Sequence, residues 1–228
     1  MFILALLGLA AFIALVFGPQ FWIKWTMSKH ALERPDMPGT GGELARHLLD
    51  DAGLQDVKLE VVQGGGDHYS PDEKAVRLSE ANFKGKSITA IAVAAHEVAH
   101  AIQHRDGYAP LLWRQRLVKK TIVIERFGSL VLMATPLVFA LVRSPVVLIL
   151  EIAVALGILA STIVIHIFTL PTEFDASFKE ALPVLENYIP PDEMPGARSV
   201  LKAAAFTYVA SALVSLLNVA RWLRILRF

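Results

Sequence analysis

Residues 1–23 form an apolar run with no charged side chain before Lys24. At a rise of about 1.5 Å per residue, a helix of this length covers the roughly 30 Å hydrocarbon core of a bilayer. The run lacks the basic segment that opens a secretory signal peptide, because Phe2 already belongs to it. We therefore predict a retained transmembrane anchor over 1–23, with Trp22 and Trp25 at the membrane interface.

Three further segments are candidate membrane spans. Two of them, about 127–142 and 144–170, are joined so tightly that we predict a helical hairpin. The last, about 203–219, is followed by three arginines. It is either a fourth transmembrane helix or an amphipathic helix that lies in the interface. With 54% hydrophobic and only 19% charged residues, the composition is shifted from that of a soluble domain toward lipid.

The distribution of lysine and arginine predicts an orientation, because these residues favour the cytoplasmic side of spans. Segment 24–126 carries basic residues near both ends, whereas the link in the predicted hairpin carries only Arg143. We therefore expect 24–126 in the cytoplasm, and counting crossings returns 171–202 to the same side. The arginines after 203–219 then fall outside. This conflicts with the rule unless they reach headgroups or the last helix does not cross.

The remaining composition excludes several classes of protein. Lysine and arginine number 22 against 21 aspartates and glutamates. The net charge of +1 therefore gives no reason to expect a nucleic-acid partner. The sequence contains no cysteine, so disulfide scaffolds, cysteine-based zinc modules and thiol nucleophiles are excluded.

Segment 24–126 has the pattern of a small α+β unit. Leucines at helical spacing predict a helix from Thr40 to Ala52. Alternating apolar residues predict short strands at Val57–Val61 and Ala75–Ser79. A helix rich in alanine, isoleucine and valine is predicted from residue 87 to residue 104.

The predicted helix 87–104 contains His96, Glu97 and His100 in an H-E-x-x-H motif. Residues four apart lie one above the other on a helix, so both imidazoles can reach one tetrahedral zinc ion at about 2.0–2.1 Å. The glutamate points aside, where it can take a proton from a zinc-bound water. An alanine-rich core helix with packed histidines is the alternative, but it would leave costly unpaired groups. We therefore predict one Zn²⁺ per chain, with Glu97 as general base.

A catalytic zinc ion needs a third protein ligand. Glu173 is the first candidate, because it follows the predicted span 144–170 on the side assigned to the H-E-x-x-H helix. His166, inside that span, is a second candidate. His104 continues the histidine register but lies about 12 Å along the axis from His96. We expect His104 to support a ligand or to be a polar helix end.

Four blocks of the chain together resemble the YugP-like neutral zinc metallopeptidases of bacterial membranes. The blocks are Asp67–Pro71, Val76–Ser79, Ala94–His104 and Leu170–Ser177, in that order over nearly the whole chain. The resemblance implies a gluzincin-like site in which His96, His100 and Glu173 hold zinc and Glu97 is the base.

The chain is more loosely similar to the HtpX-type membrane proteases, whose last block has an aspartate where Ser177 stands. Asp175 is the candidate for that supporting role. It lies about 200° around a helix from Glu173, so it could orient a ligand histidine but not share the metal. Capping of a helix that begins after Pro171 would account for either acid without a metal.

The chain also offers candidates for substrate binding. Strand Ala75–Ser79, with Val76, Arg77 and Leu78, is either an edge to which an extended substrate adds or a plain structural edge. Four side chains are candidates for stabilising an oxyanion, and the sequence does not choose among them: His68, Tyr69, Arg198 and Tyr208.

The predicted fold class is a mainly α membrane protein with about four transmembrane helices and a small α+β zincin-like (gluzincin-like) domain. Its parts are an anchor (1–23), a cytoplasmic-face zincin-like domain (24–126), a transmembrane hairpin (127–170), a segment that returns the third ligand (171–202) and a last transmembrane or interfacial helix (203–228).

The expected function is that of a zinc metalloendopeptidase, multi-pass in the plasma or inner membrane. Its expected substrates are proteins or peptides near the lipid bilayer, and a regulatory membrane partner is not identified. An intramembrane zinc is disfavoured, because only about 15 Å of helix separates Lys86 from His96. The alternative is a non-catalytic membrane module, a scaffold or transporter-like protein with a structural metal site. Bound zinc with cleavage that depends on Glu97 would separate the two.

Overall fold

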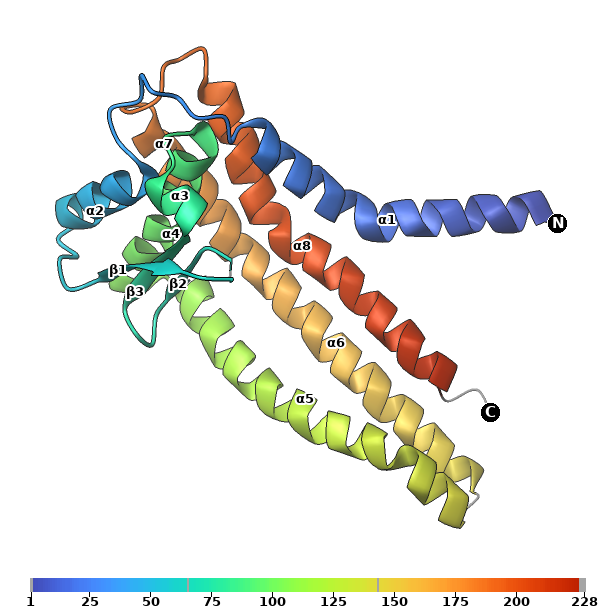
Figure 1. The fold of residues 1–228 in the computed structure, drawn as a ribbon. Coiled ribbons are helices and arrows are strands. Elements are labelled where there is room, and N and C mark those ends of the chain that lie inside the picture. The colour runs from blue at the N-terminus through green and yellow to red at the C-terminus, as the bar shows by residue number, and fades with distance from the viewer. Residues whose placement is uncertain (1, 65, 143, 226–228) are drawn as a thin grey trace.

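The fold joins a small α+β head to long helices (Figure 1), in a computed structural model that describes residues 2–64, 66–142 and 144–225. Within these residues the elements are α1 (Phe2–Lys29), α2 (Gly41–Asp51), β1 (Lys58–Val62), β2 (His68–Ser70), β3 (Ala75–Ser79), α3 (Glu80–Lys84), α4 (Ile88–Arg105), α5 (Ala109–Val142), α6 (Pro145–Asp175), the π-helical turn η1 (Ala176–Ala181), α7 (Leu182–Leu185) and α8 (Met194–Ile225). The expectation of a mainly helical chain with a small sheet is confirmed.

The sheet has the strand order β1-β3-β2. β1 runs parallel to β3, with Leu59 opposite Val76. β2 runs antiparallel to β3, with His68 opposite Arg77. Among the described residues, β3 is therefore the central strand, and β1 and β2 are the edges.

The prediction that Val76, Arg77 and Leu78 form an open edge for substrate is wrong. β1 pairs with β3 along Ala75–Ser79, and β2 occupies the other side along residues 75–77. Alternation identifies a strand but not its neighbours, and β2 has only three residues, too few to show a period of two.

Helix α4 forms the centre of the head. It packs against α2, α8 and η1, and every side chain from Thr89 to Ala101 is buried. Ser87 caps its first turn by accepting a hydrogen bond from the amide of Ala90 at 3.1 Å. Because α4 is enclosed on all sides, each polar group along it needs a partner inside the protein.

Gly41 allows α2 to lie close to α3 and α4. A Cβ atom at this position would stand 2.2 Å from the carbonyl oxygen of Asn82 and 2.7 Å from that of Ala90. No side chain fits there without movement of the backbone. Thr40 begins α2 in a reciprocal capping box with Glu43.

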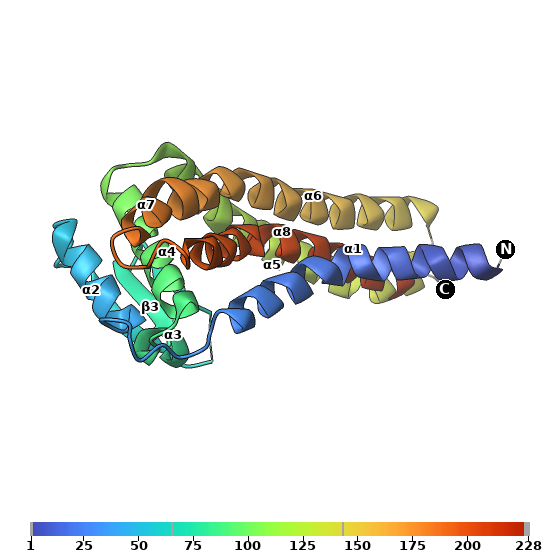
Figure 2. The same ribbon diagram turned by 90° about the horizontal axis from the view of Figure 1, so that it is seen from above.

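The long helices pack in the series α5, α6, α8, α1, and Figure 2 shows α8 between α6 and α1. The predicted hairpin over 127–170 corresponds to the end of α5 and most of α6. Helix α6 does not end at Pro171 but continues to Asp175, where it passes into η1.

Two segments of the described residues are long and apolar enough to cross a membrane, Leu6–Lys29 in α1 and Met194–Val214 in α8. These two segments qualify by their length and composition only, and the core helix of a soluble protein can have the same length and composition. The described residues therefore contain two candidate spanning helices, and the expectation of four is not supported. The predicted spans in α5 and α6 include many residues whose side chains lie outside the described set.

Candidate metal centre

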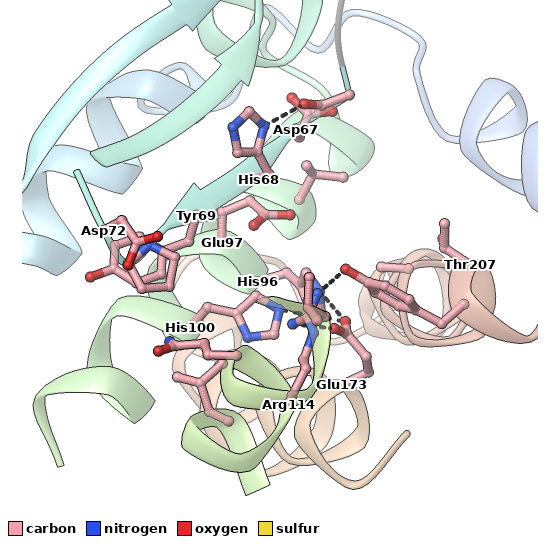
Figure 3. Close-up of a pocket in the computed structure, with 18 of the residues that line it drawn as sticks. Asp67, His68, Tyr69, Asp72, His96, Glu97, His100, Arg114, Glu173 and Thr207 are labelled. Atoms are coloured by element: carbon pink, nitrogen blue, oxygen red, sulfur yellow. Dashed lines mark hydrogen bonds and ion pairs between the residues drawn. The ribbon is translucent and has the colours of Figure 1, made fainter. Parts of the chain in front are cut away.

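Three buried side chains converge where α4 meets the end of α6 (Figure 3). The Nε2 atom of His96 lies 3.2 Å from Oε2 of Glu173, and Nε2 of His100 lies 3.4 Å from the same oxygen. One ligand atom from each residue lies within 4.8 Å of the other two. Among the described residues, His96, His100 and Glu173 form the one cluster of histidine and acidic side chains that could hold a metal ion.

The local fold explains this convergence. The two histidines stand one helical turn apart on α4, and their rings meet edge to face at 4.7 Å between centroids. Glu173 lies in the last turn of α6, and η1, which continues this helix, packs directly against α4. The helical period therefore aligns the histidines, and the packing of η1 on α4 brings the carboxylate to them.

Ser177 determines which nitrogen of His96 carries hydrogen. Its hydroxyl donates to the carbonyl oxygen of Leu201 at 3.1 Å. It therefore accepts from Nδ1 of His96, which lies 3.1 Å away. This leaves the lone pair of Nε2 directed toward Glu173.

Gln103 determines which nitrogen of His100 carries hydrogen, as Ser177 does for His96. Its amide nitrogen donates to the carbonyl oxygen of Thr172 at 3.0 Å and to Oδ1 of Asp175 at 2.9 Å. The carbonyl oxygen of Thr172 has no proton to donate, so the amide orientation of Gln103 is set and its Oε1 accepts from Nδ1 of His100 at 3.0 Å. Asp175 thus reaches His100 through Gln103 and not directly.

Two of the three separations between ligand atoms fit a tetrahedral zinc site. Ligand atoms at about 2.0–2.1 Å from one ion, at tetrahedral angles, lie roughly 3.3–3.4 Å apart. The observed separations from Glu173 Oε2 are 3.2 and 3.4 Å. Two imidazole nitrogens and a carboxylate oxygen are also the ligand types that zinc prefers.

Burial and charge separate the two carboxylates of the site. Burial raises the pKa of Glu97, and the nearby His96 and His100 only partly oppose it. Burial also acts to raise the pKa of Glu173, but the facing imidazoles, with His100 first, outweigh it and hold that pKa well below its usual range. Glu173 is therefore a permanent anion, whereas Glu97 is more basic than an ordinary glutamate.

A pocket of about 520 Å³ opens beside the three converging side chains, and Glu97 lines it. Figure 3 shows the carboxylates of Glu97 and Glu173 reaching the pocket from different helices. Apolar side chains from α1, α4 and α5 form much of its wall, among them Met27, Val93, Leu111, Val118 and Ile122. The loop that leads into β2 borders the pocket on the head side.

His104 is bonded to Tyr69 and is not part of the converging group. The hydroxyl of Tyr69 lies 2.9 Å from Nδ1 of His104. Burial raises the pKa of Tyr69 to about 12, so its hydroxyl keeps its proton and can donate to this nitrogen. His104 therefore supports a pocket-lining residue of β2 instead of a ligand histidine.

The other predicted site residues are divided between the pocket and the surface. His68 and Tyr208 line the pocket. Arg198 is exposed on α8 and is absent from the described residues that line it. His166 packs its ring against Tyr208 at 6.0 Å between centroids, and it lies outside the converging group that the described residues form.

Sequence reasoning missed two residues that contact the centre. Gln103 stands three residues after His100, so the helical period alone could have placed it beside that ring. Arg114 of α5 forms an ion pair with Glu173, with its Nη1 3.2 Å from Oε1, and it donates to the hydroxyl of Tyr208. No local pattern marks Arg114, because its approach depends on how α5 folds back beside α6.

Comparison with known proteins points to the same chemistry. Residues 4–227 match the sequence model of the family described as "Putative neutral zinc metallopeptidase". The chain is 39% identical over 221 residues to "Putative membrane protease YugP" of Bacillus subtilis (strain 168), covering 94% of this chain and 93% of that protein. No solved structure matches.

Proposed function

This chain belongs to the neutral zinc metallopeptidase family, and we propose that it is a membrane-bound endopeptidase in which His96, His100 and Glu173 hold one zinc ion. One observation carries the proposal. The Nε2 atoms of both histidines and an oxygen of Glu173 meet within 4.8 Å, while Ser177 and Gln103 engage both Nδ1 atoms. Acceptor atoms that converge in a buried site need a cation between them.

The open side of the centre supports a catalytic role over a structural one. Structural zinc sites are closed by four protein ligands, whereas catalytic sites leave one position for water. Here the described residues supply three ligands, and a pocket of about 520 Å³ adjoins them. A non-catalytic membrane module with a structural metal would not need this opening.

In the proposed mechanism, Glu97 transfers the proton. A zinc ion held by His96, His100 and Glu173 would supply Lewis acidity, which would lower the pKa of a water in the open position and polarise a carbonyl group. Glu97 takes a proton from the attacking water and delivers it to the nitrogen of the leaving amine. Its raised pKa makes it a stronger base for this transfer than an exposed glutamate.

The outer edge of β2 is the proposed site for the substrate backbone. β2 is an edge strand of the described sheet, and His68 and Tyr69 line the pocket. An extended peptide could add to this edge through main-chain hydrogen bonds, with its scissile bond beside Glu97. Among the candidates for oxyanion donor, Tyr208 is favoured. It lines the pocket and accepts from Arg114, so its own hydroxyl proton is available to a substrate oxygen.

The proposed location is the cytoplasmic face of the plasma or inner membrane, with membrane-associated proteins as substrates. The pocket wall includes Met27 of α1 and Thr207 of α8, and both lie in segments long and apolar enough to span a bilayer. Exposed Trp25 and Trp113 stand beside Lys29 and Arg116, at 5.1 and 5.6 Å from ring centroid to cation. Such aromatic and basic pairs are typical of a membrane interface.

Metal analysis of the full-length protein in detergent tests the ligand set. We expect about one zinc ion per chain in the wild type. Glu173→Ala should weaken zinc binding by on the order of 100-fold or more, because it removes a direct ligand. His166→Ala, on the same helix but outside the converging group, is the matched control and should bind zinc like the wild type. Unchanged binding in Glu173→Ala would refute the ligand set, and a wild type that binds no zinc would refute the function.

A further inference from the structure

The two oxygens of Glu173 have different partners. Oε2 faces both histidines, at 3.2 and 3.4 Å from their Nε2 atoms. Oε1 instead accepts from Nη1 of Arg114 at 3.2 Å. The carboxylate is therefore divided between the proposed metal position and a guanidinium group.

Arg114 is itself held in place by Tyr208. Its Nη2 donates to the tyrosine hydroxyl, and its guanidinium carbon lies 4.6 Å from the centroid of the same ring. The side chain of Arg114 is 19% exposed and that of Glu173 is 2% exposed, so solvent screens their ion pair only weakly. One side chain thus connects α5, α6 and α8 at the metal centre.

This arrangement bears on how Glu173 can coordinate a metal. A carboxylate can bind zinc through one oxygen or through both. When Oε1 is engaged by Arg114, only Oε2 is available, so the three protein ligands fill three positions of a tetrahedron. The fourth position then stays open for water, as a catalytic site requires.

We propose that Arg114 is a positioning residue that restricts Glu173 to coordination through a single oxygen and so keeps the fourth zinc position open. This inference rests on the proposed zinc site but assigns a role that the ligand set alone does not imply. The fork geometry of arginine matters, because one nitrogen reaches Glu173 while the other reaches Tyr208.

Cobalt substitution gives a test that does not depend on activity. The metal-free full-length protein is loaded with Co²⁺, whose visible absorption is strong in four-coordinate sites and weaker in five-coordinate ones. The wild type should give the strong spectrum. Arg114→Gln should give the weak one, because both oxygens of Glu173 become available to the metal. Arg114→Lys, which keeps the charge on one donor, should recover part of the four-coordinate spectrum.

Arg116→Gln is the matched control. Arg116 lies two residues away on α5, is exposed and stacks on Trp113, so its removal should leave the spectrum unchanged. Zinc affinity, measured by chelator competition, should fall about 10- to 100-fold in Arg114→Gln. Thermal melts of the metal-free forms report whether each variant folds. If Arg114→Gln does not fold, the spectrum of Arg114→Lys is compared with that of the wild type instead.

The outcomes separate this inference from the proposed function. A wild-type spectrum and wild-type zinc affinity in Arg114→Gln would overturn the role of Arg114 while leaving the zinc site intact. A wild type that binds neither metal would overturn both proposals.

Discussion

The hydroxyl of Ser177 lies 3.1 Å from Nδ1 of His96 and donates to the carbonyl oxygen of Leu201. The looser family resemblance has an aspartate at this position, and the expected substitute was Asp175. In the structure Ser177 and Asp175 support different histidines. Ser177 contacts one histidine directly, and Asp175 acts on His100 through Gln103.

Removal of the Ser177 hydroxyl should weaken metal binding. In Ser177→Ala the Nδ1 hydrogen of His96 loses its acceptor in a buried site, so the ring is no longer held with Nε2 toward Glu173. We expect zinc affinity to fall about 10-fold, measured by chelator competition. Ser199→Ala is the matched control, since that hydroxyl donates to the carbonyl of Pro195 in α8, away from the metal centre. Equal affinities in the two variants would show that the Ser177 contact does not orient the ligand.

Replacement of Glu97 by glutamine should separate metal binding from catalysis. The amide keeps the shape of the side chain but cannot accept a proton from water. Hydrolysis of casein should drop by at least about 100-fold, while zinc content stays near that of the wild type. Asp72→Asn, which also removes a negative charge at a pocket-lining position, controls for the change of charge in the pocket. Retained activity in Glu97→Gln would rule out the proposed base.

The zinc-free protein should lose stability as the pH rises above neutrality. Burial acts to lower the pKa of His100, but the charge of Glu173 outweighs it, so the pKa is raised. Because the folded value exceeds the unfolded value of about 6.5, the folded state binds this proton more tightly. The resulting stabilisation is complete below about pH 6.5 and is lost as the pH rises through the folded pKa.

Thermal melts of chelator-treated protein, taken from about pH 6 upward, measure this dependence. His100→Gln should make the dependence shallower, because one titrating group is gone, while the buried Glu97, whose pKa is also raised, contributes in the same direction and keeps part of it. The lowered pKa of Glu173 keeps that group ionised throughout this range, so it adds no slope. His47→Gln, a change at an exposed histidine beside Asp51, should melt like the wild type at each pH. A slope as steep in His100→Gln as in the wild type would contradict the assignment.

A methyl group at Gly41 should destabilise the head. The added Cβ atom would stand 2.2 Å from the carbonyl oxygen of Asn82, so α2 must move away from α3 and α4. We expect Gly41→Ala to cost about 1–3 kcal/mol of unfolding free energy, measured by denaturant titration. Gly18→Ala is the control, because nothing lies within 4 Å of its Cβ position. Equal stability of the two variants would show that the close approach of α2 is not required.

The sequence predicted the features that depend on local periodicity. The expected helix at 87–104 corresponds to α4 (Ile88–Arg105), and the expected strands at Val57–Val61 and Ala75–Ser79 correspond to β1 and β3. The expected alignment of His96 and His100 follows from 3.6 residues per turn and needs no tertiary information. The choice of Glu173 over His166 came from counting membrane crossings and from family resemblance, and the structure brings Glu173 beside the histidines.

Tertiary structure alone decided which elements are neighbours. The alternation of β3 is the same whether the strand is central or at an edge, so only the pairing with β2 excluded it as a substrate edge. Arg114 reaches Glu173 from a different helix, and Ser177 reaches His96 across 81 positions of chain. Periodicity records which face of an element is buried. It does not record what that face packs against, because long-range contacts arise only when the whole chain has folded.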